Sequence, residues 1–257
     1  MGVLVSAIVI TLNEERNIAR CLSSLGTVDE IVVVDACSTD RTVEIARQFT
    51  PNVHVRPWPG YVPQKAYAVE QARNEWVLWV DADEELSPEL VSELAALTPG
   101  DAAGFEIPRR TMYLGRWIRH SGWWPEYVLR LFRKPVSRFD DKFVHERVRV
   151  DGPVRRLLNP LNHYSYPSLR LHVEKMNVYT DLAAQEMMRR GRHVSVASAC
   201  IHGMAKFVGT YIIRLGFLDG RQGLILAVMA SYYAFLKYAK AWELQNCDDQ
   251  LNRCKRP

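Results

Sequence analysis

The sequence lacks the features of several large protein classes. Its five cysteines are odd in number and widely scattered, and no two have the Cys-x-x-Cys spacing of a zinc or redox site. We therefore expect reduced thiols in a cytoplasmic protein rather than a disulfide framework. No Gly-x-Gly-x-x-Gly follows a predicted strand, which argues against dinucleotide binding. The net charge of +4, from 33 basic and 29 acidic residues, is too small to indicate a nucleic-acid partner.

Segments for export or for crossing a membrane are also lacking. The first apolar run, residues 3–12, follows no basic segment and leads directly into polar Asn13-Glu14-Glu15-Arg16, so we expect no cleaved signal peptide. No uninterrupted apolar stretch reaches the roughly 18 residues of a spanning helix. With 257 residues, 48% of them apolar, the chain is long enough for one domain with a sizeable core and an appendage.

The first hundred residues alternate between strand and helix patterns. Apolar runs rich in β-branched residues predict strands at residues 3–12, 31–34, 53–55 and from 76 to 80. Helical spacing and helix-start residues predict helices at residues 17–25, from 41 to 49, at 63–73 and after Ser87-Pro88-Glu89. Strands that alternate with helices predict a parallel sheet with right-handed crossovers.

The pattern changes at Gly104. Strand-like segments separated by turns predict a mixed or antiparallel half, at residues 104–107, 127–132, 143–150 and 157–164. From Ser168 the chain is helical, and Gly191 is the expected end of the first helix. We therefore expect a sheet domain at residues 1–166, with halves at 1–100 and 101–166, and a helical region at residues 167–257.

Two apolar blocks in this helical region, residues 207–218 and 223–236, are flanked or interrupted by basic residues. These are Lys206, Arg214, Arg221, Lys237 and Lys240. Such helices can lie in the interface of an anionic membrane, form a homo-oligomer contact, or pack on the sheet domain. The basic flanks favour the membrane surface.

The strand at residues 76–80 ends in the carboxylates of Asp81 and Asp83. Positions i and i+2 of an extended chain point to the same side, so both carboxylates can reach one bound group. Paired oxygens suit Mg²⁺ or Mn²⁺, which also removes their mutual repulsion. Alternatively, these acids only precede the next helix, an explanation that suits Glu84 and Glu85 better than a carboxylate pair at a strand end.

Polar residues follow two other strands of the predicted sheet. The first strand ends at Thr11-Leu12-Asn13-Glu14, and the second ends at Asp35, followed by Ser38-Thr39-Asp40. Neighbouring parallel strands place their carboxyl ends on one rim, so these groups should converge with Asp81 and Asp83. The combination predicts a binding site, although Ser38, Thr39 and Asp40 alone suit a helix entry.

These three strand ends resemble the nucleotide-sugar half of inverting family 2 glycosyltransferases with the GT-A fold. More narrowly, three other segments resemble bacterial enzymes of lipopolysaccharide core assembly, including β-1,4-glucosyltransferases. They are Tyr61-Val62-Pro63-Gln64-Lys65, Phe143-Val144-His145-Glu146 and His163-Tyr164-Ser165-Tyr166. The resemblance covers about residues 3–180 and is specific as a combination. It implies an α/β fold with a mixed, helix-flanked sheet and a C-terminal helical appendage.

The resemblance also implies roles for the rim residues. A UDP-sugar donor would be bound by Thr11, Asn13, Glu14, Asp35, Lys65 and Asp81. Of these, Glu14 and Asp35 would contact the uracil or ribose, and Asp81 the ribose or a metal-bound water. Lys65 would meet a phosphate, or is a solvated helix lysine. Asp83 would bind a divalent cation, Mn²⁺ or Mg²⁺, with His163 as a further ligand.

Glu146 is the candidate for the base that takes the proton of the acceptor hydroxyl, because it follows apolar Phe143-Val144 and a partly desolvated carboxylate is a better base. A salt bridge to Arg147 or Arg149 is the alternative. His145 alternates away from Glu146 and is expected to be structural. Arg119, His120, Trp123, Trp124 and Arg130 are the candidate acceptor contacts, although the aromatic residues can equally fill a core and the basic residues can form a solvated face.

The implied function is metal-dependent transfer of a hexose from a UDP-sugar to a lipopolysaccharide-core or other lipid-linked acceptor. Its expected location is peripheral, on the cytoplasmic face of the inner membrane. Two alternatives stay open at this point. One is a noncatalytic nucleotide- or glycan-binding module, and the other is an Asp-x-Asp phosphatase, in which that motif would follow the first strand.

Overall fold

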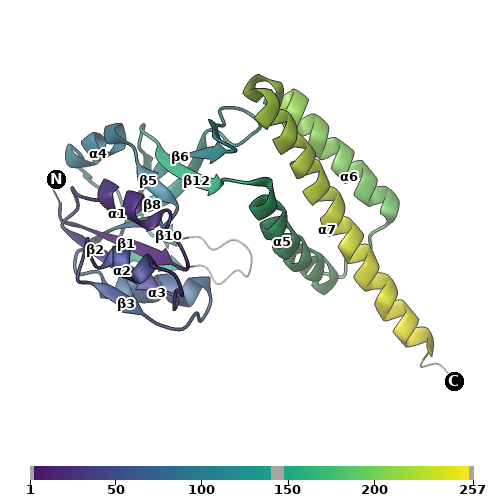
Figure 1. Cartoon of the computed structure of the whole chain (residues 1–257), viewed down its shortest axis with the longest axis horizontal. Helices are drawn as coiled ribbons and strands as arrows, with labels where there is room; N and C mark the ends of the chain where they lie inside the picture. The colour runs from purple at the N-terminus through teal and green to yellow at the C-terminus, as the bar shows by residue number, and fades with distance from the viewer. Residues whose placement is uncertain (1–2, 140–147, 255–257) are drawn as a thin grey trace. The chain divides into compact units, whose positions relative to one another are not determined.

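The computed structural model describes the backbone of residues 3–139 and 148–254 and the side chains of these ranges up to residue 246. The chain divides into two compact units (Figure 1). The sheet unit comprises Met1–Thr111 and Pro125–Ser165, and the helical unit comprises Met112–Trp124 and Tyr166–Pro257. The segment Met112–Trp124 therefore groups with the helices, whereas the sequence pattern placed it in the second half of the sheet domain.

The elements of the first part of the chain alternate as expected. The strands are β1 (Val5–Thr11), β2 (Glu30–Asp35), β3 (Val53–Val55), β4 (Trp76–Asp81), β5 (Glu84–Leu86), β6 (Gly104–Tyr113), β8 (Glu126–Arg133), β9 (Ser137–Phe139), β10 (Val148–Val150), β11 (Val154–Arg156) and β12 (Leu161–Tyr166). The helices are α1 (Ile18–Ser24), α2 (Thr42–Ala46), α3 (Tyr61–Gln71), α4 (Pro88–Ala95) and the short 3₁₀ turn η1 (Lys134–Val136).

The main sheet is mixed. Its strand order is β3-β2-β1-β4-β8-β6-β12-β5. The first four strands are parallel, β8 runs antiparallel to both β4 and β6, and β12 runs antiparallel to β5. The predicted change from a parallel to a mixed half is therefore confirmed, and so is the expected α/β class with a C-terminal helical region.

The central strand β1 is buried along its whole length, because helices cover both faces of the sheet. Ile8 and Ile10 pack with Ala68 and Val69 of α3 on one face. Val9 packs on the other face, in a cluster that includes residues of α1 and α4. This alternation fixes the register of the parallel strands, and with it the rim where their carboxyl ends meet.

Two boundaries differ from the sequence prediction. The helix α2 ends at Ala46 instead of Phe49, because the last turn tightens to bonds such as Phe49 N–H to the Ala46 carbonyl. The predicted strand at 157–164 begins only at residue 161. The Glu93 carboxylate accepts the N–H groups of Leu158 and Asn159, both at 2.9 Å, which removes these donors from the sheet.

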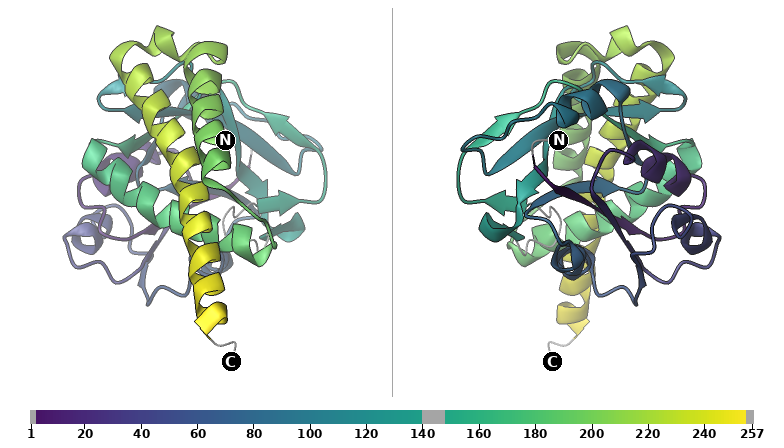
Figure 2. Two further views of the ribbon diagram at one scale, coloured as in Figure 1. Left: turned by 90° about the vertical axis from the view of Figure 1, so that its right-hand side faces the viewer. Right: turned by 90° about the vertical axis from the view of Figure 1, so that its left-hand side faces the viewer.

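The helical unit contains three long helices and an irregular connection. They are α5 (Leu169–Arg189), α6 (Val196–Val208), the π-helical turn η2 (Gly209–Ile213), the 3₁₀ turn η3 (Gly216–Asp219) and α7 (Gly220–Cys254), with β7 (Arg116–Trp117) paired to the end of β6. As predicted, α5 ends just before Gly191, which has a φ of 65°. Figure 2 shows α6 beside α7, and Gly203 permits this approach because an added Cβ would lie 3.3 Å from Ser231 O.

The segment Val196–Ile213, which joins α6 and η2, is long and apolar enough to cross a membrane by length and composition. Its mean hydropathy is 1.3, and 17% of it is buried. The segment contains no uninterrupted apolar run of spanning length, since Ser198, His202 and Lys206 interrupt it. The apolar blocks predicted at 207–218 and 223–236 correspond to the irregular connection and to the first half of α7.

An aromatic cluster forms a core of the helical unit. Tyr113 is fully buried and lies edge-on to Trp123, Tyr166 and His172. The Tyr113 hydroxyl lies 2.9 Å from Nδ1 of His172. Burial raises the pKa of Tyr113 to about 12, and burial together with Lys175 lowers the pKa of His172. The pair is therefore stable when the imidazole is neutral and the Tyr113 hydroxyl, which keeps its proton, donates a hydrogen bond to Nδ1.

This pair predicts a pH dependence of stability. Because the pKa of His172 in the folded chain lies below the unfolded value of about 6.5, acid favours the unfolded state, which takes up a proton that the folded state resists. The free energy of unfolding should therefore fall as the pH drops below about 6.5. Urea unfolding between about pH 7.5 and about pH 5.5 should show a smaller change for His172→Gln than for the wild type. The control, exposed His193→Gln, should keep the wild-type slope, and equal slopes for all three proteins would contradict the prediction.

Candidate active site

The carboxyl ends of β1, β2 and β4 lie side by side at one rim of the sheet. Thr11 is paired with Asp35, and the neighbouring Ile10 is paired with Asp81. Thr11 and Asp35 are buried, with exposures of 4% and 0%. The strand ends that the sequence singled out are therefore adjacent, as the parallel register requires.

Hydrogen bonds tie the loops after β1 and β2 to each other. Asn13, in the left-handed region with a φ of 54°, donates its N–H to Ser38 Oγ at 2.8 Å and accepts the Thr39 N–H on Oδ1 at 2.8 Å. The Glu14 N–H donates to Thr42 Oγ1 at 2.8 Å. The polar cluster at residues 38–40 therefore fixes the loop that carries Asn13 and Glu14, in addition to preceding α2.

Asp35 is held by one residue of this cluster. Its Oδ1 accepts the Ser38 N–H at 2.8 Å, and its Oδ2 accepts the Ser38 hydroxyl at 2.5 Å. A carboxylate oxygen has a second lone pair. Asp35 can therefore keep both bonds to Ser38 while it accepts a hydroxyl or N–H donor from a ligand.

The end of β4 contains a buried ion cluster. The Arg130 guanidinium lies 2.6 Å from Asp81 Oδ2 and 2.7 Å from Glu84 Oε1. Glu84 is fully buried, and its second oxygen accepts the Asp81 N–H at 3.0 Å. The indole N–H of Trp79 donates to Asp81 Oδ1 at 2.9 Å, and Arg109 lies 3.4 Å from Glu84. Each oxygen of Asp81 thus has a fixed donor.

This cluster determines the charge state of Asp81. Burial alone would raise the pKa of its carboxyl, but the positive charges of Arg130 and Lys65 outweigh burial and hold the pKa well below its ordinary value. In return, Asp81 and Glu84 raise the pKa of Arg130 despite its burial. Both groups are therefore ionised at neutral pH.

Lys65 lies on the same side of β4 as this cluster. It is 7% exposed, and its Nζ stands 3.9 Å from the centre of the Trp79 ring, whose other cationic contact is Arg130 at 4.2 Å. Its neighbour Gln64 is fully buried, and neither polar atom of the Gln64 amide has a hydrogen-bond partner in the part of the chain that the structure describes. The same holds for Thr11 Oγ1. Buried polar groups of this kind are expected to bond to a ligand or water.

Asp83 faces His163, the pair that the family resemblance implies for a cation site. Asp83 Oδ2 lies 3.4 Å from His163 Nε2, and His163 Nδ1 lies 3.4 Å from Thr111 Oγ1. With metal–ligand distances of about 2.1 Å, two ligands of one cation stand roughly 3 Å apart, so this pair fits a divalent ion. Within the described ranges, no group of three or more His, Cys, Asp or Glu side chains is arranged to hold a metal. A cation here would therefore need further oxygens from phosphate or water.

The remaining predicted site residues lie elsewhere. Glu146 and His145 fall outside the described residues. Arg119, His120, Trp123 and Trp124 belong to the helical unit. There, the N–H groups of Arg119 and His120 donate to Asp219, both at 3.0 Å. Arg130 is 3% exposed and bound to Asp81 and Glu84, so we no longer assign it to the acceptor.

Sequence reasoning missed the partners of Asp81. Glu84 was interpreted as a helix-start acid, and Trp79 only as part of an apolar strand. A signal was present in Trp79, because it stands two positions before Asp81 and so points to the same side. Arg109 and Arg130 gave no such signal, since their strands come much later in the chain.

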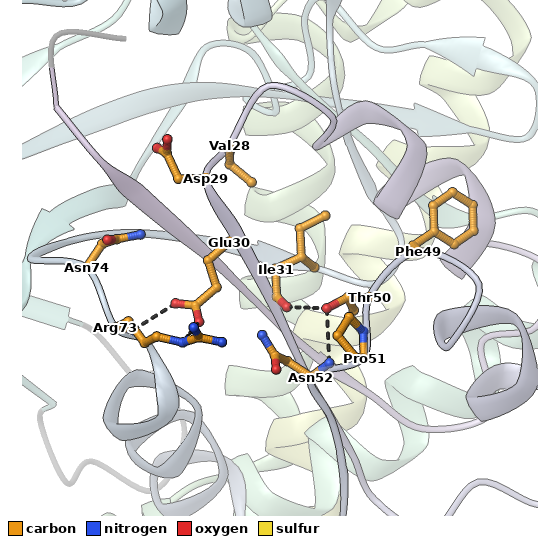
Figure 3. A pocket seen from close by; sticks show the side chains of 10 residues that line it. All are labelled: Val28, Asp29, Glu30, Ile31, Phe49, Thr50, Pro51, Asn52, Arg73 and Asn74. Carbon is orange, nitrogen blue, oxygen red and sulfur yellow. Dashed lines mark hydrogen bonds and ion pairs between the residues drawn. The ribbon is translucent and has the colours of Figure 1, made fainter.

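A separate cavity of about 400 Å³ opens near the amino ends of β2 and β4, away from these strand ends (Figure 3). Its lining includes Glu30 and Arg73, which form an ion pair at 2.8 Å. None of the predicted site residues lines it. The candidate active site is therefore the rim at the carboxyl ends, not this cavity.

Comparison with known proteins gives concordant relatives. The chain is 32% identical to an uncharacterized glycosyltransferase of Rickettsia typhi, and the alignment covers 97% of this chain and 93% of that protein. It is 31% identical to the lipopolysaccharide core biosynthesis glycosyltransferase LpsC of Rhizobium meliloti, covering 96% of this chain and 97% of LpsC. Among solved structures, residues 1–349 of Staphylococcus aureus TarS in complex with UDP-GlcNAc match with a TM-score of 0.48 and 17% identity, over 95% of this chain and 92% of that one.

The sequence pattern of one protein family covers more than half of the chain. The family described as Glycosyl transferase family 2 matches residues 6–155, the part that contains the rim residues of β1, β2 and β4. Together with relatives that are more than 30% identical over nearly the whole chain, this match shows that the chain belongs to glycosyltransferase family 2.

Proposed function

We propose that this family 2 glycosyltransferase transfers a hexose, with inversion, from a UDP-sugar to a lipopolysaccharide-core or other lipid-linked acceptor. The main observation is the rim at the end of β4, where ionised Asp81 and the Asp83–His163 pair stand near Lys65. Carboxylates for a sugar or cation and a lysine for phosphate are the groups that a nucleotide-sugar requires. The acceptor class is supported by similarity to LpsC over nearly its full length.

In this proposal the donor lies across the three strand ends. Asp35 and Glu14 accept hydroxyl or N–H donors of the nucleoside, and Thr11 and Asn13 line the same end of β1. Asp81 accepts a ribose hydroxyl, because Arg130 and Trp79 keep it ionised and fixed in position. Lys65 meets the diphosphate as a point charge.

Asp83 and His163 would hold a divalent cation, Mn²⁺ or Mg²⁺. When bound, such an ion stabilises the negative charge that accumulates on the departing diphosphate. Thr111 contacts Nδ1 of His163 and so orients the ring, with Nε2 directed at Asp83. This pair is the part of the site that the cation would depend on.

For the acceptor step, Glu146 remains the proposed base on sequence grounds. It would take the proton of the acceptor hydroxyl as that oxygen attacks the anomeric carbon and the bond to UDP breaks. Arg119, His120, Trp123 and Trp124 are the proposed acceptor contacts. A lipid-linked acceptor places the enzyme at the cytoplasmic face of the inner membrane, where it would be bound peripherally.

The first prediction concerns Asp83. Calorimetric titration with UDP, GDP and CDP, each with and without Mn²⁺, should show UDP binding that Mn²⁺ strengthens. Asp83→Ala should lose most of the gain from Mn²⁺, about tenfold or more in affinity, because it removes one of two side-chain ligands. The matched control, Asp101→Ala, removes an exposed carboxylate paired with Arg155 and should bind like the wild type.

Two results would count against this proposal. If no nucleotide binds the wild type, the donor site is assigned wrongly. If UDP binds but is never released from a UDP-sugar in the presence of acceptor glycans, the chain is a binding module and not a transferase.

The second prediction concerns Arg130. In the wild type Asp81 is ionised across the neutral range, so UDP affinity between about pH 7.5 and about pH 5.5 should change only as the terminal phosphate of UDP takes up its proton, at about pH 6. Arg130→Met removes the largest charge that lowers the pKa of Asp81 and leaves the carboxyl buried, so this pKa rises. Below that pKa, the affinity of the variant relative to the wild type should fall by roughly tenfold per pH unit, as the carboxylate takes up a proton.

Arg133→Met is the control for this experiment. It removes a cation from the same strand whose partner is Glu75, and it should keep the wild-type pH profile. A wild-type profile in Arg130→Met as well, with the fold intact by circular dichroism, would show that Arg130 does not set the charge of Asp81.

A further inference from the structure

The irregular connection between α6 and α7 exposes an unusual amount of apolar surface. We call Gly209–Asp219, which contains η2 and η3, the elbow. Ile213 is 74% exposed, and Phe217 and Leu218 are 46% and 49% exposed. On α6, Met204 and Ile201 reach 71% and 66%. Exposed apolar side chains that gather in one short stretch of the chain point to an interaction site.

The charges around this surface have one sign. From the start of α6 at Val196 to Arg221, the charged residues are the cations Lys206, Arg214 and Arg221 and one acid, Asp219. Lys206, Arg214 and Arg221 are exposed, whereas Asp219 is 1% exposed. The surface therefore presents apolar groups and cations without a carboxylate, which matches an anionic lipid surface.

Asp219 is buried because the segment Met112–Trp124 covers it. Its oxygens accept the N–H groups of Arg119 and His120, both at 3.0 Å, and the Ser121 hydroxyl at 3.1 Å. The Ser121 N–H in turn donates to the Arg214 carbonyl at 2.8 Å. The only acid of this region thus holds the elbow in shape and is removed from its surface.

The backbone shows that the apolar segment turns at the elbow. Leu215 and Gly220 have positive φ angles of 54° and 66°, so the chain leaves the helical path after Val196–Ile213 and reverses into α7. Arg214 and Arg221 stand on either side of this reversal. Lys206 lies near the middle of Val196–Ile213, where a spanning helix would place its charge in the bilayer core, and this favours a helix that lies in the membrane interface over one that crosses it.

We propose that the elbow and the exposed face of α6 are an in-plane docking surface for an anionic bilayer. This inference deepens the proposed function, since it rests on the lipid-linked acceptor and identifies the residues that bring the enzyme to it. The apolar side chains Ile213, Phe217 and Leu218 enter the interface. Lys206, Arg214 and Arg221 bind the anionic headgroups.

Flotation of the full chain with vesicles tests this docking surface. Vesicles of phosphatidylcholine with about one third phosphatidylglycerol should carry the wild type at about 0.05 M salt, and about 0.5 M salt should release most of it. Pure phosphatidylcholine should carry at least about tenfold less. The double variant Ile213→Asp with Leu218→Asp should lose nearly all binding. The control Leu158→Asp, at an 81% exposed apolar residue of the sheet unit, should float like the wild type.

Each other outcome overturns the inference. Undiminished flotation of the double variant would show that the elbow is not the docking surface. Flotation that resists both high salt and alkaline washing would identify a spanning helix. Absence of flotation, with dimers of the wild type that the double variant abolishes in sedimentation, would assign the surface to a second copy of the chain.

UDP binding measured on the same samples separates this inference from the proposed function. The double variant should bind UDP like the wild type, because its substitutions lie in the helical unit and the donor residues lie in the sheet unit. If the wild type floats but does not bind UDP, the donor assignment is wrong and the docking surface is retained. If the wild type binds UDP but does not float, the docking surface is wrong and the donor assignment is retained.

Discussion

The contact of Arg130 with Asp81 and Glu84 is the constraint on which the candidate site depends. Asp81 and Glu84 lie side by side at the end of β4, and a cation between them offsets both their mutual repulsion and the several kcal/mol that an unpaired buried charge costs. That cation comes from β8, which runs antiparallel to β4 and pairs Leu131 with Leu78. The residue before Leu131, Arg130, therefore lies level with the residue after Leu78, Trp79, and reaches Asp81. A purely parallel sheet would need another source of charge here. In this chain the antiparallel strand of the mixed sheet supplies that charge.

The other two strand ends are built from hydroxyl and amide groups instead of ion pairs. Ser38 holds Asp35, and Asn13 and Thr39 hold the loops together, so these ligands are fixed without compensating cations. Buried Gln64 and Thr11 keep polar atoms with no partner among the described residues, although burial of an unsatisfied polar group costs about 1–3 kcal/mol. A polar ligand at this rim would meet groups that folding has already desolvated. The site thus combines one strand end held by ion pairs with two neighbours that hydrogen bonds hold in place.

The sequence predicted the alternating elements, the parallel first half and the three strand ends, because hydrophobic periodicity and parallel register are local or pairwise rules. It also predicted that Asp83 and His163 could share a cation, but only through a family resemblance. It missed the role of Arg130, which depends on the register of β8 against β4. It also grouped Met112–Trp124 with the sheet domain, because aromatic and basic residues do not reveal that Asp219, about 100 positions later, accepts their backbone N–H groups. Long-range polar contacts of this kind carry no periodic signal.

Charge is distributed unequally between the two units. The helical unit contains 15 Lys and Arg residues against 7 Asp and Glu, a net charge of +8, so the sheet unit, with 18 against 22, has a net charge of −4. Near an anionic surface the first is attracted and the second repelled. In the proposed docking, this asymmetry would direct the helical unit toward the bilayer. At the end of β4, the charges of Arg109 and Arg130 are balanced by the carboxylates of Asp81, Glu84 and Glu126, so a positive potential for an anionic donor would depend there on Lys65 and on a bound cation.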